Sequence, residues 1–289
     1  MSKTPDFSAL EQALDATVTR QARLPVGYGL KGYHLALSDG RELAVKAGDA
    51  PLPDQLEAEA HMLRSLKASS NLPVPDVLYA DPRMLAMTWI NSTQGQITPA
   101  HQRHMARLLS DLHRPPRPFF GFERDTVIGI LPQPNPPTPA WVPFFRDQRL
   151  LFLARFAHER GKLPASLLTR LQHLGEKLES WLDEPSHPAL IHGDIWSGNV
   201  LLGNSQINAL IDPAVYYAHP EIELAYLTMF GSFGDDFFRE YGALTPFDRD
   251  GFFARRRGIY LLYPLLVHVL LCGPAYLRDI ENTLQNLKV

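Results

Sequence analysis

The chain has 289 residues, on the order of two domains at about 150 residues each. Its 28 Lys and Arg against 31 Asp and Glu give a formal net charge of −3, which argues against nucleic acid or an anionic membrane as a partner. The single cysteine, Cys272, excludes an intramolecular disulfide, so we expect a buried thiol in a cytoplasmic protein. The first residues lack the charged-then-apolar order of a signal peptide, so no export is expected.

Apolar spacing in the first part of the chain predicts one helix followed by a small antiparallel sheet. Apolar residues recur at helical spacing from Phe7 to Val18, so a helix is expected there. The segment 25–46 reads as strand, loop, strand, hairpin and strand, and two further strands at 74–80 and 84–90 complete a sheet of about five. Gly27 and Gly29 in the first loop could let backbone amides approach a triphosphate.

Lys46 ends one of these strands, and Glu59 lies on the helix expected after Pro53. Glu59 falls on the apolar face of that helix, three residues after Leu56 and four before Leu63. A carboxylate on an inward face needs a partner, and Lys46 is the obvious one. Such a pair holds the lysine against the α and β phosphates in kinases. The alternative is a solvent-facing helix acid and an ordinary strand lysine.

A boundary between a nucleotide-binding lobe and a helical lobe is expected near residue 90. The polar run 91–96 leaves the sheet, and backbone groups of Thr88, Trp89 and Ile90 are placed to pair with an adenine edge. We therefore divide the chain into a small N-terminal lobe, 1–90, and a larger, mainly helical lobe, 91–289.

Helical patterns dominate the rest of the chain, beginning with a helix from Thr98-Pro99 to His113. We expect His113 to cap the end of that helix. The uncharged run 259–273 imitates a membrane span, but it is shorter than the roughly 20 residues that a span requires, and Pro264 interrupts it. It is predicted to be a buried, kinked helix.

The stretch 189–212 carries the chemistry. Residues 189–191 read as a buried strand, 192–198 as a loop and 199–202 as a second strand, with a turn at 203–206 and a return strand at 207–211. Pairing across that turn brings Asp212 back opposite Asn199. The side chains of Asp194, Asn199 and Asp212 therefore converge.

This convergence suits phosphoryl transfer, which depends on positioning and on neutralising phosphate charge. Asn199 and Asp212 offer the hard oxygen ligands that suit Mg²⁺. Asp194, at the loop tip, can accept or orient the proton of a substrate hydroxyl. The spacing of His192, Asp194, Asn199 and Asp212 matches the protein-kinase catalytic loop and its metal-binding aspartate.

The motifs His192-Gly193-Asp194-Ile195-Trp196-Ser197-Gly198-Asn199 and Ile211-Asp212-Pro213-Ala214 resemble the signature of the fructosamine kinase (ketosamine kinase) family, relatives of the aminoglycoside phosphotransferases. Further matches span most of the chain, at Phe120-Gly121-Phe122, Leu131-Pro132-Gln133-Pro134-Asn135, Trp141-Val142-Pro143-Phe144-Phe145 and Tyr260-Leu261-Leu262-Tyr263.

The resemblance implies an α+β, protein-kinase-like fold of two lobes that uses ATP and Mg²⁺. The implied substrate is a small-molecule or protein-bound ketosamine, such as a fructosamine or ribulosamine. Phosphorylation at the third sugar carbon would make the adduct fall apart, which is protein deglycation. Trp196 is expected to face the acceptor, together with Pro134-Asn135 and Trp141. Glu223, where relatives carry Asp, is expected to be a structural anchor.

Other readings stay open at this point. The acceptor could be another small polyol or an aminoglycoside, and Trp196 could be a hydrophobic pin under the loop. From another class, the chain could be a pseudokinase that serves as a binding module, although Lys46, Glu59, Asp194, Asn199 and Asp212 fill every chemical position. The sequence does not fix the oligomeric state, and a monomer is favoured.

Overall fold

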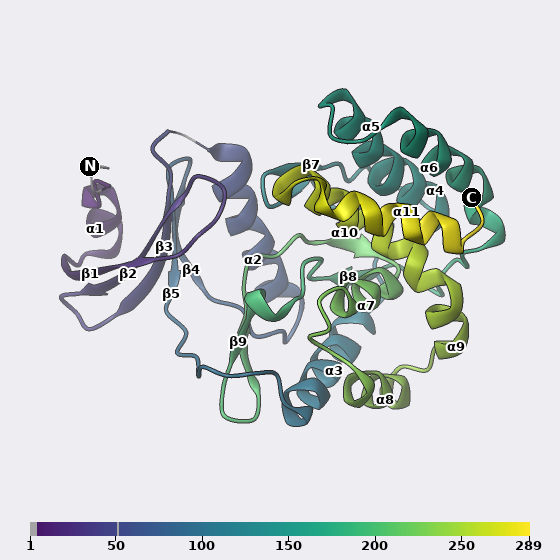
Figure 1. The fold of residues 1–289 in the computed structure, drawn as a ribbon. Coiled ribbons are helices and arrows are strands. Elements are labelled where there is room, and N and C mark those ends of the chain that lie inside the picture. Colours follow the sequence, from purple (N-terminus) through teal and green to yellow (C-terminus); the bar gives the residue numbers. More distant parts are fainter. Residues whose placement is uncertain (1–4, 51) are drawn as a thin grey trace.

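The computed structural model of the chain describes residues 5–50 and 52–289, and it has two lobes (Figure 1). An antiparallel sheet and helix α1 (Ser8–Leu14) form one lobe, and most of the other helices form the second. The predicted α+β, two-lobed, kinase-like fold is thus confirmed. Within the described residues the sheet has five strands in the order β1-β2-β3-β5-β4, which are β1 (Val18–Leu24), β2 (Lys31–Leu37), β3 (Glu42–Ala47), β4 (Val77–Asp81) and β5 (Met84–Thr88).

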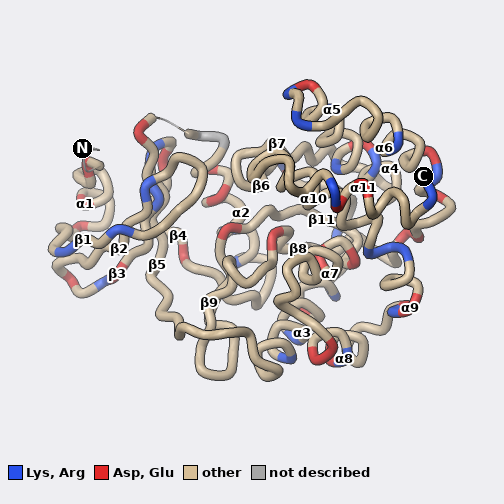
Figure 2. The backbone as a smooth tube through the Cα atoms, viewed as in Figure 1, with Lys and Arg blue, Asp and Glu red and all other residues tan. Residues whose placement is uncertain are grey.

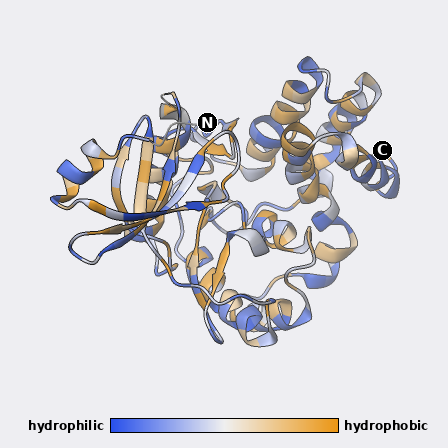
Figure 3. Cartoon of the chain, turned by 60° about the vertical axis from the view of Figure 1, so that its left-hand side comes forward, coloured by the Kyte–Doolittle hydropathy of each residue, from blue (hydrophilic) through white to orange (hydrophobic). Residues whose placement is uncertain are grey.

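Strand β3 lies at the centre of this sheet, and its two faces have different neighbours. Leu43, Val45 and Ala47 are buried and pack in one core with Phe7 and with other residues of the sheet. The strand period of two puts Lys46 on the opposite face. Figure 3 shows the hydrophobic residues along these strands. The alternation therefore aims Lys46 at the cleft between the lobes.

The first helix is shorter than predicted. Helix α1 (Ser8–Leu14) ends because Asp15 adopts the left-handed conformation, with φ of 51°. Val18, expected at the end of the helix, begins β1 and is paired with Leu37. The apolar spacing that continued to Val18 came from the strand, so the predicted helix over 7–18 was wrong at its C-terminal end.

Helix α2 (Ala58–Ser69) follows a π-helical turn, Pro53–Glu57, and lies between the sheet and the larger lobe (Figure 1). Leu56 of the turn and Ala60 and Leu63 of the helix belong to the core of the larger lobe. Because this helix joins that core, the division of the chain at residue 90 stays a prediction.

The larger lobe is mainly helical. Its α-helices are α3 (Pro99–His113), α4 (Trp141–Phe144), α5 (Leu151–Glu159), α6 (Ala165–Lys177), α7 (Pro220–Thr228), α8 (Asp235–Leu244), α9 (Arg249–Gly251), α10 (Arg257–Cys272) and α11 (Leu277–Asn286). Three antiparallel strand pairs accompany them, namely β6 (Thr126–Ile128) with β7 (Leu131–Gln133), β8 (Ala189–Ile191) with β11 (Tyr216–Ala218), and β9 (Val200–Leu202) with β10 (Ile207–Leu210). Charged residues of both signs are interspersed along the chain (Figure 2).

Helix α10 contains the uncharged run, and most of its residues are buried, as predicted. Pro264 lies inside it. Across the described part of the chain, no helix has the length and apolar character needed to cross a membrane. Cys272, expected to be buried, is exposed, because α10 ends at this residue and Gly273, with φ of 108°, turns the chain away.

Candidate active site

The catalytic loop is fixed to the segment that follows Asp212. Strands β8 and β11 pair Ile191 with Tyr216, and the backbone N–H of Ala214 donates to the carbonyl of His192 at 2.8 Å. Gly193 has φ of 86°, and a Cβ atom there would clash with the carbonyl oxygen of Ala214. The loop therefore requires glycine at this position, both for its conformation and for the close approach of the two segments.

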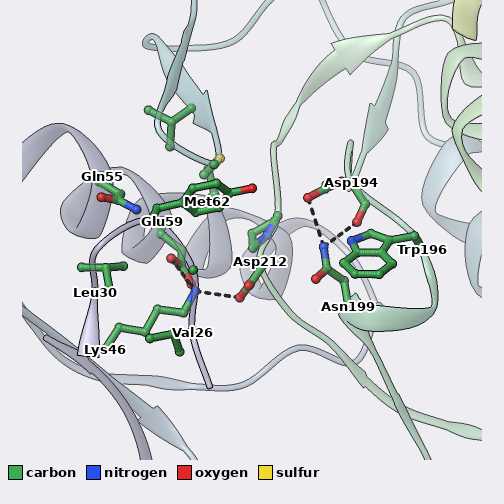
Figure 4. Close-up of a pocket in the computed structure, with 15 residues that line it drawn as sticks. Val26, Leu30, Lys46, Gln55, Glu59, Met62, Asp194, Trp196, Asn199 and Asp212 are labelled. Atoms are coloured by element: carbon green, nitrogen blue, oxygen red, sulfur yellow. Dashed lines mark hydrogen bonds and ion pairs between the residues drawn. The ribbon is translucent and has the colours of Figure 1, made fainter. Parts of the chain in front are cut away.

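The β9–β10 hairpin brings Asp212 beside Asn199, as predicted. The N–H of Ile211 donates to the carbonyl of Asn199 at 3.0 Å. The amide nitrogen of Asn199 donates to the backbone oxygen and to Oδ2 of Asp194, at 2.8 and 3.1 Å. The Asn199 amide oxygen is left pointing toward Asp212 (Figure 4). Asp212 itself adopts φ of 55°, an unfavourable backbone for a residue other than glycine, and such strain is concentrated at functional sites.

Lys46 lies between two carboxylates (Figure 4). Its Nζ is 2.7 and 2.9 Å from the two oxygens of Glu59 and 2.7 Å from Oδ1 of Asp212. Burial alone would lower the pKa of Lys46, but the charges of Glu59 and Asp212 outweigh it and raise that pKa. Lys46 therefore remains a cation in the cleft, and the predicted Lys46–Glu59 contact is present.

Asp194 has the environment of a general base. Burial and the charge of Asp212 raise its pKa to about 7, while hydrogen bonds from Tyr226 and Asn199 oppose the rise. Its Oδ1 atom is buried and has no hydrogen-bond partner within the described residues. A carboxylate with an unused oxygen and a pKa near neutrality can accept the proton of a hydroxyl group.

A buried network holds the loop from below. Glu223 on α7 accepts the N–H of Gly193 at 2.8 Å, and its other oxygen lies 2.8 Å from Nε2 of His113. Nδ1 of His113 lies 2.8 Å from the hydroxyl of Tyr241. Glu223 is thus the expected anchor. His113 ends α3 but does not cap it, because both of its ring nitrogens are engaged in this network.

Two adjoining cavities meet at these residues. A cavity of about 240 Å³ is lined by Lys46, Glu59, Asp194, Asn199 and Asp212 among others. A neighbouring cavity of about 540 Å³ is lined by the expected hinge residues Thr88, Trp89 and Ile90, and by apolar side chains that include Val26, Ala44, Met87 and Leu201. Gly27 lines both cavities. Gly29 lines neither, although its φ of 76° shapes the loop.

Trp196 lines both cavities and is 38% exposed. Its ring covers Gly198, where a Cβ atom would clash with it, and lies 5.6 Å from the ring of Phe230. A hydrophobic pin would be buried under the loop. The exposed face favours the reading in which Trp196 meets the acceptor.

The other residues expected near the acceptor are part of the core. Trp141 is fully buried, is stacked on Phe145 at 5.6 Å and donates to the hydroxyl of Tyr260 at 3.0 Å. Asn135 is also buried and contacts the guanidinium of Arg149. The expectation that Pro134-Asn135 and Trp141 face the acceptor was wrong, because these residues stabilise the scaffold behind the site.

Two site residues were not anticipated from the sequence, namely Tyr226 and Tyr28. Tyr226 lies three residues after Glu223 and therefore on the same helical face, which points at the catalytic loop. That spacing was a usable signal. Tyr28, between Gly27 and Gly29, lines the smaller cavity.

The fold and the site together define a phosphotransferase of the protein-kinase-like type. The fructosamine kinase family model matches residues 3–289, so the chain belongs to the fructosamine kinase family. A relative described as a probable ketoamine kinase from Synechocystis is 30% identical over 275 residues, which cover 92% of this chain and 90% of the relative. The chain is accordingly an ATP-dependent phosphotransferase that acts on a hydroxyl group.

Solved structures agree with this assignment. The crystal structure of a putative fructosamine-3-kinase from Thermobifida fusca is similar with a TM-score of 0.88 and 34% identity, over 99% of this chain and 100% of that one. The aminoglycoside phosphotransferase APH(4)-Ia shares the fold, with a TM-score of 0.67 and 15% identity over 96% of this chain and 97% of its own.

Proposed function

We propose that the chain phosphorylates a sugar hydroxyl of ketosamines, with Asp194 as the general base. The observation that carries the proposal is the convergence, in one cavity, of Asp194, Asn199 and Asp212 with the Lys46–Glu59 pair, in a member of the fructosamine kinase family. The family and the relative's description as a ketoamine kinase support a ketosamine as the acceptor.

The nucleotide occupies the larger cavity in this proposal. Backbone groups of Thr88 to Ile90 meet the adenine edge, and the apolar side chains enclose its faces. Lys46, held by Glu59, meets the phosphates where the two cavities join, and Gly27 approaches them from the loop. Positioning of this kind is most of what phosphoryl transfer requires of a protein.

Asn199 and Asp212 suit Mg²⁺. The Asn199 amide oxygen points toward Asp212, whose carboxylate is turned to Lys46. Hard oxygen atoms are the ligands that Mg²⁺ prefers, alongside phosphate oxygens and water. When bound, the ion would neutralise phosphate charge. Lys46 already contacts Asp212, so the lysine and the metal site would share that carboxylate.

The acceptor enters on the Trp196 side of Asp194. Asp194 takes the proton of the sugar hydroxyl while that oxygen forms its bond to the γ-phosphorus and ADP leaves. The exposed face of Trp196 can stack on the sugar or on the cationic amine for about 0.5 to 2 kcal/mol. Phosphorylation of the hydroxyl on the third carbon would turn it into a leaving group, so the adduct would break down and release the amine.

A panel of glycated amines tests the proposal. ADP release is measured with Mg²⁺-ATP and each glycated amine, with the unglycated amine as the matched control. We expect release with fructosyl-lysine or ribulosyl-lysine and none above background with lysine. ADP release with aminoglycosides or simple polyols, and none with ketosamines, would show that the acceptor is not a ketosamine.

A thermal shift separates an enzyme from a pseudokinase. Mg²⁺-ATP at about 100 times its dissociation constant should add about 2.7 kcal/mol of stability. A chain that neither binds nucleotide nor releases ADP with any acceptor would be a binding module instead.

A further inference from the structure

The tip of the glycine-containing loop carries an aromatic residue in a strained conformation. Tyr28 has φ of 60° and is flanked by Gly27 and Gly29. The left-handed region is unfavourable for a bulky side chain, so this backbone persists only where surrounding contacts or function require it. Tyr28 is 48% exposed, and its loop belongs to the smaller lobe and borders the cleft.

The ring of Tyr28 crosses the cleft and rests on the larger lobe. A Cβ atom placed on Gly129, in the turn between β6 and β7, would lie 3.0 Å from Cζ and 3.1 Å from Cε2 of Tyr28. The same atom would lie 3.1 Å from Cδ1 of Leu271, at the end of α10. Gly129 thus forms a slot that receives the phenol between two segments of the larger lobe.

Tyr28 lies on only one side of the site. Val26 and Gly27 line both cavities, whereas Tyr28 lines the smaller cavity, which contains Asp194, and not the one with the hinge residues. Burial and the charge of Asp194 raise the pKa of Tyr28, so its hydroxyl is in the field of the proposed base and is protonated at neutral pH. The loop therefore presents different residues to the nucleotide and to the acceptor.

We propose that Tyr28 is a positioning residue that closes the acceptor side of the reaction cavity by docking its ring in the Gly129 slot. Closure excludes water from the γ-phosphate, so that ATP is used on the acceptor hydroxyl rather than hydrolysed, and it confines the acceptor beside Asp194. The inference rests on the proposed phosphotransfer function and assigns part of its selectivity to a residue of the nucleotide loop.

Substitution of Tyr28 tests this directly. Tyr28→Ala should raise KM for fructosyl-lysine several-fold, increase ATP hydrolysis without acceptor, and lower the ratio of phosphorylated product to ADP, while KM for ATP stays within about twofold of the parent value. Tyr28→Phe retains the ring and should keep the parental ratio.

The slot offers an independent test with a matched control. Gly129→Ala places a methyl group against the Tyr28 ring. It should lower the ratio of phosphorylated product to ADP, here called coupling, as Tyr28→Ala does. Gly161→Ala introduces a side chain at nearly the same backbone angle, φ of 66° against 59°, but meets nothing within 4 Å, so it should leave coupling unchanged. Tyr28→Ala combined with Gly129→Ala should cost little more than either alone, because both act through one contact.

Two results would overturn the inference. Unchanged coupling in both Tyr28→Ala and Gly129→Ala would show that the Tyr28 ring does not close the acceptor side of the reaction cavity. A raised KM for ATP with an unchanged KM for the acceptor would make Tyr28 an ordinary nucleotide-loop residue. ATP hydrolysis without acceptor is measured in every variant, so the inference remains testable even if fructosyl-lysine proves not to be a substrate of the parent.

Discussion

Replacing Asp194 with Asn removes the proposed base and leaves the shape of the site in place. The amide can still accept from Asn199, and neither proposed metal ligand is altered. We expect turnover to fall by about 10² to 10⁴, the usual contribution of a positioned acid-base group, while Mg²⁺-ATP binding stays within a few-fold of the parent.

The pH profile gives this prediction a second readout. With a pKa of about 7, the ionised fraction of Asp194 rises about tenfold between pH 6 and pH 8. The parental kcat/KM should rise by the same factor, and Asp194→Asn should lose this dependence.

Stability should change in the opposite direction to activity. The pKa of Asp194 is raised from 3.8 to about 7, so the folded chain holds this proton more tightly than the unfolded chain does. Ionisation therefore opposes folding increasingly from about pH 4 to pH 7, and the full penalty is present above pH 7. Asp194→Asn should melt at a higher temperature than the parent at pH 8, and the difference should vanish near pH 4.

Three measurements on purified protein decide the matter, namely steady-state ADP release from pH 6 to pH 8, calorimetry of Mg²⁺-ATP, and thermal melts at both ends of the pH range. The reasoning is refuted if Asp194→Asn keeps more than about a tenth of parental turnover, or if it retains the pH-dependent rise.

Four further substitutions separate the roles of the remaining residues. Asp212→Ala should abolish Mg²⁺-dependent ATP binding in calorimetry and Asn199→Ala should weaken it less, because a neutral amide contributes less to the ion; equally tight binding by Asp212→Ala would contradict the metal role. Trp196→Leu should raise KM for a glycated lysine several-fold with little change in KM for ATP or in Tm, whereas a joint loss of all three would favour the pin. Glu223→Ala leaves the buried N–H of Gly193 without its acceptor, so chemical denaturation should show a loss of at least about 1 to 3 kcal/mol, and no loss would exclude the anchor.

Local spacing predicted the site well where one short segment fixes the geometry. The hairpin length between Asn199 and Asp212 sets their approach, and the helical period places Glu59 opposite Lys46, so both contacts followed from the sequence. Glu223 of α7 was predicted as an anchor from the family resemblance, although its partner Gly193 was visible only in the structure.

Predictions were wrong where contacts between distant segments determine the structure. The apolar spacing from Phe7 to Val18 looked helical. However, α1 ends at the left-handed Asp15, and Val18 pairs with Leu37 of β2. Trp141 belongs to a motif that resembles the family, yet it packs in the core against Phe145 and Tyr260. The spacing of residues in a sequence does not show whether such a motif contacts the acceptor or supports the core. The contact of Tyr28 with Gly129 joins segments about a hundred residues apart, beyond the reach of local patterns.

The central claim is that this site transfers the γ-phosphate of ATP to a ketosamine hydroxyl with Asp194 as the base. Its most direct test is phosphorus NMR of fructosyl-lysine incubated with Mg²⁺-ATP and either the parent chain or Asp194→Asn. The parent should generate a sugar phosphate ester in step with ADP, and the variant should generate almost none. An ester formed equally by both proteins, or ADP released by the parent without any ester, would contradict the account.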